Sequence, residues 1–310
     1  MKNTSSSFSL ISKVNLILFL LIYSYNYSQD IEPRRWSSMP LGTNVVGLGY
    51  VYTFGDLKFD PLLNVENATV SVNSLALQYV RPFKIGNKLA RVDVLIPYSI
   101  ASWDGVLNNV PTAVKRNGFA DPRLRFSLNF IGPKAMTSKD LQEYLKENPK
   151  YTIVGASLSI SFPFGQYYND KLLNLSNNSF IFRPQVGMVH YWGKWSYEVT
   201  GSVFFYTNNN DFYNNTTKKQ DPLFAMQTHL IRKFKHRIWT SLSLGYGQGG
   251  SSIVNRQPKN DERGNFLGGL SAGMPIFKNQ SIKLSYGTTL TVKDIGANTN
   301  GFIFSWAAIF

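Results

Sequence analysis

The stretch that decides the fold closes the chain: "GFIFSWAAIF", residues 301–310. Apolar side chains, most of them aromatic, recur at every second position from Phe302 to Phe310. Successive side chains of a β-strand point to opposite faces, so this period of two predicts a strand with one apolar face. A protein surrounded by water rarely ends on such a face. The ending therefore favours a strand whose apolar side meets lipid.

Segments with the same alternation fill the rest of the chain. In "RLRFSLNFI", residues 123–131, the apolar residues take one parity and two arginines, a serine and an asparagine take the other. The set expected to point outward is Leu124, Phe126, Leu128 and Phe130. We predict twelve strands, near 43–53, 70–82, 88–99, 121–131, 151–163, 179–192, 194–207, 221–233, 236–248, 263–275, 280–292 and 300–310.

The connections between these segments alternate in length. Short turns such as residues 193–194 alternate with longer polar loops such as "NNNDFYNNTTKKQ". Successive hairpins produce this alternation when one end of a barrel faces the periplasm and the other faces outside. One short-turn connection is longer, and "SKDLQEYLKEN" within it predicts a helix over 138–147, with Ser138 as its cap and Pro149 after its end.

Alternation alone does not separate a soluble β-sandwich from a membrane barrel, but three features favour the barrel. Inward faces carry charges, and an even number of strands closes a sheet so that no backbone group is left unpaired in lipid. Apolar faces also end in aromatic residues, namely Tyr50, Tyr52, Tyr79, Tyr98, Phe162, Trp192, Tyr246 and Tyr286. The predicted fold is an all-β transmembrane antiparallel up-and-down barrel of about 12 strands with one short periplasmic helix.

The N-terminus predicts export. Lysines precede "VNLILFLLIYSY", an apolar run of about ten residues, which has the length of a signal-peptide core and is too short to span a bilayer as a helix. We predict a signal peptide over 1–28, a leader over 29–42 and the barrel over 43–310; a retained signal anchor is the alternative. Removing 1–28 takes away two lysines, so the net charge falls from +14 to 14 − 2 = +12. Export and a barrel together place the chain in the bacterial outer membrane.

The leader holds Arg34, Arg35 and Trp36 side by side. It is either a disordered tail or a plug folded into the lumen. As a plug, its arginines would pair with an inward acid such as Asp93 or Glu198, and Trp36 would stack on the wall. The predicted substrate-binding residues combine the leader with the inward charges: Arg34, Arg35, Trp36, Arg91, Asp93, Arg123, Arg125, Arg183, Glu198 and Lys283.

Those inward charges have two interpretations. Opposite charges can simply pair across a narrow lumen, or a ring of arginines can select permeants and give a mild preference for anions. The remaining positive charge is expected to pair with outer-membrane lipid and lipopolysaccharide phosphates. The basic residues are scattered, so no nucleic acid is expected as a partner.

No catalytic residue, metal or cofactor is expected. "GLSAG" at 269–273 matches a serine-hydrolase motif, but Ser271 lies inside an alternating strand where a sharp turn is needed. A membrane-embedded hydrolase remains one alternative, with His229 as the candidate base. A structural or adhesion barrel with an occluded lumen is the other.

Two stretches resemble a known family. "DIEPRRWSSMPLGTNVVGLGYVYTFGDLKFDPLL" at 30–63 and "GFADPRLRFSLNFIGPKAMTSKDL" at 118–141 are similar to the outer-membrane barrel family called MetA-pathway of phenol degradation. The resemblance implies a transporter of small molecules, hydrophobic or aromatic ones among them. The final Phe310 also resembles the signal read by the barrel-assembly machinery. The chain is therefore expected to act as a monomer in passive uptake or binding of a small-molecule permeant.

Overall fold

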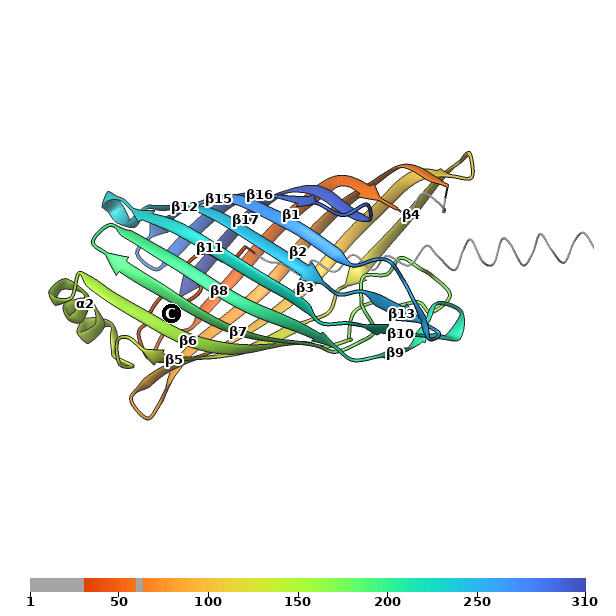
Figure 1. The fold of residues 1–310 in the computed structure, drawn as a ribbon. Coiled ribbons are helices and arrows are strands. Elements are labelled where there is room, and N and C mark those ends of the chain that lie inside the picture. Colours follow the sequence, from red (N-terminus) through yellow and green to blue (C-terminus); the bar gives the residue numbers. More distant parts are fainter. Residues whose placement is uncertain (1–30, 60–63) are drawn as a thin grey trace, which may run out of the picture.

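The computed structural model describes residues 31–59 and 64–310, so the predicted signal peptide over 1–28 lies outside the described residues. One antiparallel sheet closes into a tilted barrel (Figure 1). Its members are β1 (Val45–Lys58), β2 (Val65–Ile85), β3 (Lys88–Leu107), β4 (Val110–Phe119), β5 (Arg123–Ile131), β6 (Lys150–Ser161), β7 (Ile181–Trp192), β8 (Trp195–Tyr206), β11 (Leu223–Lys233), β12 (Trp239–Gly249), β15 (Arg263–Phe277), β16 (Gln280–Thr291) and β17 (Gly296–Ile309).

This sheet has 13 strands, but β4 and β5 lie end to end along β3, so the ring around the lumen has twelve. The twelve predicted strands are confirmed. Closure occurs between β1 and β17, which pair from Val45↔Ile309 to Lys58↔Gly296. Asn44 and Phe310 extend this ladder, because the backbone N–H of each donates to the carbonyl of the other at 2.8 and 3.0 Å. The last strand thus removes the free edge, as lipid requires.

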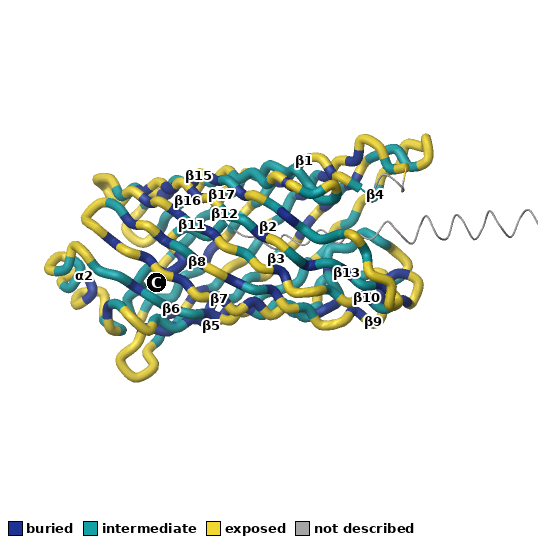
Figure 2. The backbone as a smooth tube through the Cα atoms, in the orientation of Figure 1, coloured by how far each residue is buried: buried dark blue, intermediate teal, exposed yellow. Residues whose placement is uncertain are grey.

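The apolar parity faces outward. Figure 2 shows exposed and buried residues alternating along the barrel strands. On β5, Leu124, Phe126 and Phe130 are exposed, with Phe126 42% accessible, whereas the inward Arg125 is 5% accessible. Leu128 is only half-exposed, and an irregularity in the pairing of β5 with β6 follows it at residues 129–131. The apolar set is therefore on the outside of a closed sheet, and the sandwich alternative is wrong.

One end of the barrel, here called the short-turn end, carries the C-terminus and helix α2 (Ser138–Glu147) (Figure 1). The helix boundaries are as predicted, but the cap is Thr137 and not Ser138. The Thr137 hydroxyl accepts a hydrogen bond from the N–H of Asp140 at 3.4 Å, as an N-cap does for the third residue after it. A short 3-10 helix, η3 (Lys235–Arg237), makes another turn at this end. Within the described residues, no helix is long and apolar enough to cross a membrane.

The opposite end, here called the long-loop end, is more ordered than the sequence predicts. The region near 100–120, expected as a polar loop, is the end of β3 and all of β4. The loops over 207–222 and 250–262 form a second, four-stranded sheet. It consists of β9 (Asn209–Phe212), β10 (Thr216–Gln220), β13 (Ser252–Val254) and β14 (Gln257–Pro258), with η2 (Tyr213–Asn215) between β9 and β10. These strands have no long apolar alternation because they lie outside the lipid.

Replacing Phe126 by arginine tests the lipid-facing parity. We expect the free energy of unfolding in lipid vesicles to fall by about 2–4 kcal/mol, because a guanidinium near the bilayer midplane is costly. Denaturant titration of vesicle-inserted protein measures it. Phe126→Leu is the control and should cost less than about 1.5 kcal/mol. Equal stability of Phe126→Arg and Phe126→Leu would contradict the assignment of this face to lipid.

Candidate functional site

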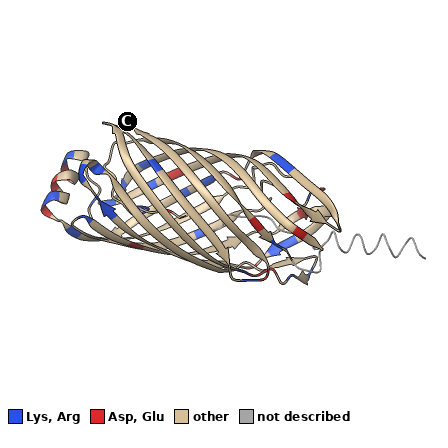
Figure 3. Cartoon of the chain, turned by 90° about the horizontal axis from the view of Figure 1, so that it is seen from above, with Lys and Arg blue, Asp and Glu red and all other residues tan. Residues whose placement is uncertain are grey.

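The leader lies inside the barrel. It enters at the short-turn end, where the Leu41 N–H donates to the carbonyl of Met136 at 2.8 Å, and it runs inward as far as Ile31 against the glycines of β15 and β16. Near its middle the chain turns at residues 33–36, with Arg34 in a left-handed conformation at φ 67°. Figure 3 shows charged residues midway along the barrel as well as at its two ends. The leader meets these interior charges.

Glu32 is the first charged contact of the leader. Its two carboxylate oxygens each accept a hydrogen bond of 2.6 Å from the two terminal nitrogens of the Arg125 guanidinium. Arg123 lies 3.6 Å and Arg35 3.8 Å from the same carboxylate. A bidentate arginine–carboxylate pair is among the stronger polar contacts in proteins. Glu32 therefore offsets the repulsion between two arginines that point inward from one strand.

Arg35 is the second contact, and it joins three strands of the wall. Its guanidinium lies 3.3 Å from the Asp93 carboxylate and donates to the Ser127 hydroxyl. Its backbone N–H donates to Glu198 at 3.0 Å, and its carbonyl accepts from Arg91 at 3.1 Å. Arg91 also lies 3.0 Å from Asp93. The ion pair between Arg35 and Asp93 is the one that the sequence suggested for a plug.

These ions hold the leader and wall together as one electrostatic unit. Arg125, Arg35 and Glu198 are nearly inaccessible to water. Breaking a buried ion pair by removing one partner typically costs about 3–5 kcal/mol, because the other charge is left uncompensated. Withdrawal of the leader would expose these charges unless water or another ion replaced it.

Trp36 anchors the leader through shape. It is 1% accessible, and its indole N–H donates to the Thr200 hydroxyl at 2.8 Å. The ring lies in a slot made by two inward glycines, since a Cβ on Gly187 would overlap the indole and one on Gly155 would come within 2.9 Å of it. Ile153, Val189 and Tyr191 complete the slot. Because these two glycines have no side chain, the wall has room for the tryptophan ring.

The predicted site residues do not all join this network. Among residues 31–59 and 64–310 no acid forms an ion pair with Arg34, contrary to expectation; Arg34 is exposed and its guanidinium lies 5.0 Å from the centre of the Trp239 ring. Arg183 lies nearer the long-loop end, with its guanidinium 4.5 Å from the centre of the Phe204 ring, but it is close enough to Glu32 for its charge to favour that carboxylate. Lys283 is half-buried on β16, opposite Gly273 and Ser305 in register.

Sequence reasoning missed Glu32 and the two slot glycines. Glu32 stands only three residues before Arg35 in the leader, so an acid beside the paired arginines was a usable signal. Gly155 and Gly187 had none, because inward glycines are common in strands of this kind and only the register places these two opposite each other.

A histidine–serine pair also faces the lumen. The His229 Nδ1 lies 2.8 Å from the Ser243 hydroxyl, with His229 on β11 and Ser243 on β12. Both lie in regular ladders, and Ser271 likewise pairs with Ser241 and Ser285 inside a continuous strand. Backbone N–H groups aimed at the reacting atom are a common part of an oxyanion site, whereas the backbone N–H groups of these ladders donate to the neighbouring strand. Among the described residues, no group of three or more potential ligands could hold a metal ion.

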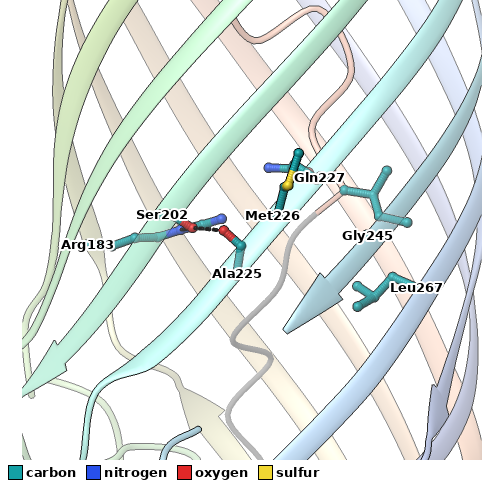
Figure 4. Close-up of a pocket in the computed structure, with 8 residues that line it drawn as sticks. Arg183, Ser202, Ala225, Met226, Gln227, Gly245 and Leu267 are labelled. Carbon is teal, nitrogen blue, oxygen red and sulfur yellow. Dashed lines mark hydrogen bonds between the residues drawn. The ribbon is translucent and has the colours of Figure 1, made fainter. Parts of the chain in front are cut away.

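The leader separates two recesses in the lumen. One lies between the leader and the wall, and Trp36, Met39, Leu89 and Arg91 are among its lining residues. The other lies beyond the inner tip of the leader at Ile31 and is lined by Arg183, Ser202, Gln227 and Leu267 among others (Figure 4). Both recesses combine apolar walls with a few polar groups, and each has room for about one water molecule while the leader is in place.

The fold matches outer-membrane barrels of known structure. The "COG4313 outer membrane channel from Pseudomonas putida F1" superposes with a TM-score of 0.75 at 17% identity, covering 91% of this chain and all of that one. The transport unit of the autotransporter AIDA-I from Escherichia coli superposes with a TM-score of 0.51 at 8% identity, covering 96% and 97%. At these identities the likeness concerns the fold. No curated protein sequence matches the chain.

The family model described by the words "MetA-pathway of phenol degradation" matches residues 42–306, which is nearly the whole barrel. The chain is accordingly a bacterial outer-membrane β-barrel and belongs to this family.

Proposed function

We propose that this barrel conducts small molecules passively across the outer membrane and that its leader is the gate. The observation that carries the proposal is the position of residues 31–41, which lie inside the lumen between the two recesses. The short-turn end faces the periplasm and the long-loop end faces outside, as in other barrels of this kind. A permeant entering from outside would meet the recess at Ile31 first and the leader next.

For the leader to move, the contacts that hold it must be exchanged for others. Ordering a residue costs about 1–2 kcal/mol in backbone entropy. The contacts of Glu32, Arg35 and Trp36 supply most of the stabilisation that offsets this cost. The two ionic contacts can be exchanged for water or for another ion. Trp36 would leave an open slot between Gly155 and Gly187 and would lose its hydrogen bond to Thr200.

The walls beside the leader suit small, partly apolar permeants once the leader has moved. The recess beside Trp36 also presents Met39 and Leu89, and the recess at Ile31 presents Leu267. These walls offer contact to a ring or a short chain, which agrees with the aromatic or hydrophobic permeants suggested by the family resemblance. The predicted substrate-binding arginines would then orient polar substituents.

The remaining partners follow from the outer surface. Exposed aromatic and aliphatic side chains on the strands contact lipid, and the scattered surface charge suits lipopolysaccharide phosphates. Phe310, 67% accessible at the end of β17, would be read by the barrel-assembly machinery. One closed ring needs no second copy to satisfy its backbone, so we propose a monomer that acts without chemistry on its permeant.

Deleting residues 30–40 should raise single-channel conductance severalfold in planar bilayers, because the lumen loses the segment that fills it. Heat-modifiable migration in gels checks that the variant inserts as a folded barrel. A folded deletion variant that conducts no more than the intact protein would show that the leader is a structural brace and would favour the occluded structural barrel.

Filling the slot tests the gate without shortening the chain. Gly187→Val should displace Trp36, lower the free energy of unfolding by about 1–3 kcal/mol through overpacking and raise conductance towards that of the deletion variant. Gly201→Val is the matched control, since a Cβ on Gly201, in the neighbouring strand, meets no atom within 4 Å. Wild-type conductance in Gly187→Val would mean that seating of Trp36 does not control passage.

A further inference from the structure

Three arginines of the barrel wall lie around the carboxylate of Glu32. Arg125 donates two hydrogen bonds of 2.6 Å to it, and Arg123 lies 3.6 Å away. Arg183, which lines the recess at Ile31 (Figure 4), is close enough for its charge to favour the same carboxylate. The arginines belong to β5 and β7, whereas Glu32 belongs to the leader. The wall therefore carries a carboxylate site that the leader fills.

The group that the wall recognises is the carboxylate itself. Beyond its β-carbon, the side chain of Glu32 is a methylene group and a carboxylate, which together correspond to acetate. Each carboxylate oxygen accepts a hydrogen bond from one terminal nitrogen of Arg125, the two-point geometry in which arginine matches a planar carboxylate. The backbone of Glu32 is held separately, since its N–H donates to the side-chain oxygen of Gln227 at 3.3 Å. A free carboxylate could therefore make the same contacts with the wall.

The site is partly accessible from the lumen. The side chains of Glu32 and Arg123 are 18% and 22% exposed, whereas that of Arg125 is 6% exposed. An entering carboxylate can thus contact Arg123 while Glu32 still holds Arg125. Exchange of one carboxylate for the other can proceed in steps, without a moment at which both arginines have lost their partner.

The acid opposite this site on the wall does not replace Glu32. Asp93 pairs with Arg125 in register, but its carboxylate already lies 3.0 Å from Arg91 and 3.3 Å from Arg35. If the leader withdrew, Asp93 would remain the neighbouring acid for more than one arginine. A further carboxylate is then favoured, because buried charge without a partner is costly.

We infer that Arg123 and Arg125 are the barrel's binding site for permeant carboxylates, and that Glu32 is a built-in ligand that keeps the leader docked by occupying this site. A small carboxylate entering from the long-loop end competes with Glu32. Each arginine has a carboxylate partner before and after the exchange, and the departing side chain makes room for the ligand. A ligand that binds the wall only when Glu32 has left shifts the leader towards release. The link to opening rests on the proposed function, but occupancy of the site can be measured without any transport.

Replacing Glu32 by alanine in the full mature chain tests the site itself. Glu32→Ala removes a methylene group and a carboxylate and leaves the wall intact, so acetate should fill the place that they occupied. Saturation-transfer NMR of the acetate methyl group, with the protein in detergent, measures the affinity. Acetate should bind Glu32→Ala at least about tenfold more tightly than the wild type, because Glu32 competes for the site in the wild type. Acetamide, which has the same size but no charge, should bind neither protein.

Glu143→Ala is the matched control, since it removes an acid from the exposed surface of α2. It should bind acetate as the wild type does. Adding Arg125→Gln to Glu32→Ala should abolish acetate binding, and Arg123→Gln provides the same test if the first double variant fails to fold. The inference is overturned if acetate binds Glu32→Ala no better than Glu143→Ala, or if acetamide binds as well as acetate.

Release of the leader can be measured through a single thiol. The chain has no cysteine, and the hydroxyl of Ser38 is inaccessible to water while the leader is docked. Acetate should raise the rate at which a maleimide labels Ser38→Cys severalfold, whereas chloride at the same ionic strength should not. Arg125→Gln should remove this effect, and Arg81→Gln, which changes an exposed arginine of β2, should leave it in place.

The two measurements separate the possible failures. A labelling rate that acetate does not change would show that carboxylates do not displace Glu32, and would overturn the competition between them. Failure of the gate would appear instead in the conductance of the deletion variant, and it would leave acetate binding by Glu32→Ala unchanged.

Discussion

Every backbone N–H and C=O of this chain that lies in lipid must find its partner within the protein, and most of the structure follows from that constraint. Only a closed sheet meets it when the spanning elements are strands. Closure requires β17 to lie against β1, and this ladder runs along the whole of both strands. Closure also determines which side chains face which way. When the apolar residues of each strand face lipid, the alternate residues must line the narrow lumen.

The narrow lumen then creates its own problem. Arginines at alternate positions of β5 point the same way and repel one another across little water. The leader resolves this with Glu32, whose carboxylate serves both Arg123 and Arg125. Trp36 of the leader fits only where the wall has no inward side chains, which is where Gly155 and Gly187 lie opposite each other. The ion pairs of Glu32 favour this segment inside the barrel, and the two glycines set the depth at which Trp36 lies.

Local patterns in the sequence were enough for the strands, the outward set on β5, closure and the position of α2. They failed where a residue's role depends on distant partners. Arg34 and Arg35 are equivalent in sequence, yet a left-handed turn at Arg34 sends one to Trp239 and the other to Asp93. The strands β4, β9, β10 and β13 were missed because, beyond the membrane, both faces meet water or polar neighbours and the period of two fades. The slot for Trp36 depends on register, which alternation does not specify.

The two ends of the leader face different chemistry, and this bears on how passage could be coupled to opening. The inner end carries Glu32, whose partners are Arg123 and Arg125. A permeant that carries a carboxylate would compete with Glu32 for these guanidinium groups. If a permeant carboxylate replaced Glu32, the wall arginines would stay paired throughout. The leader could then move without leaving a buried charge uncompensated. A neutral permeant offers no such exchange, and it would have to wait for water to replace Glu32.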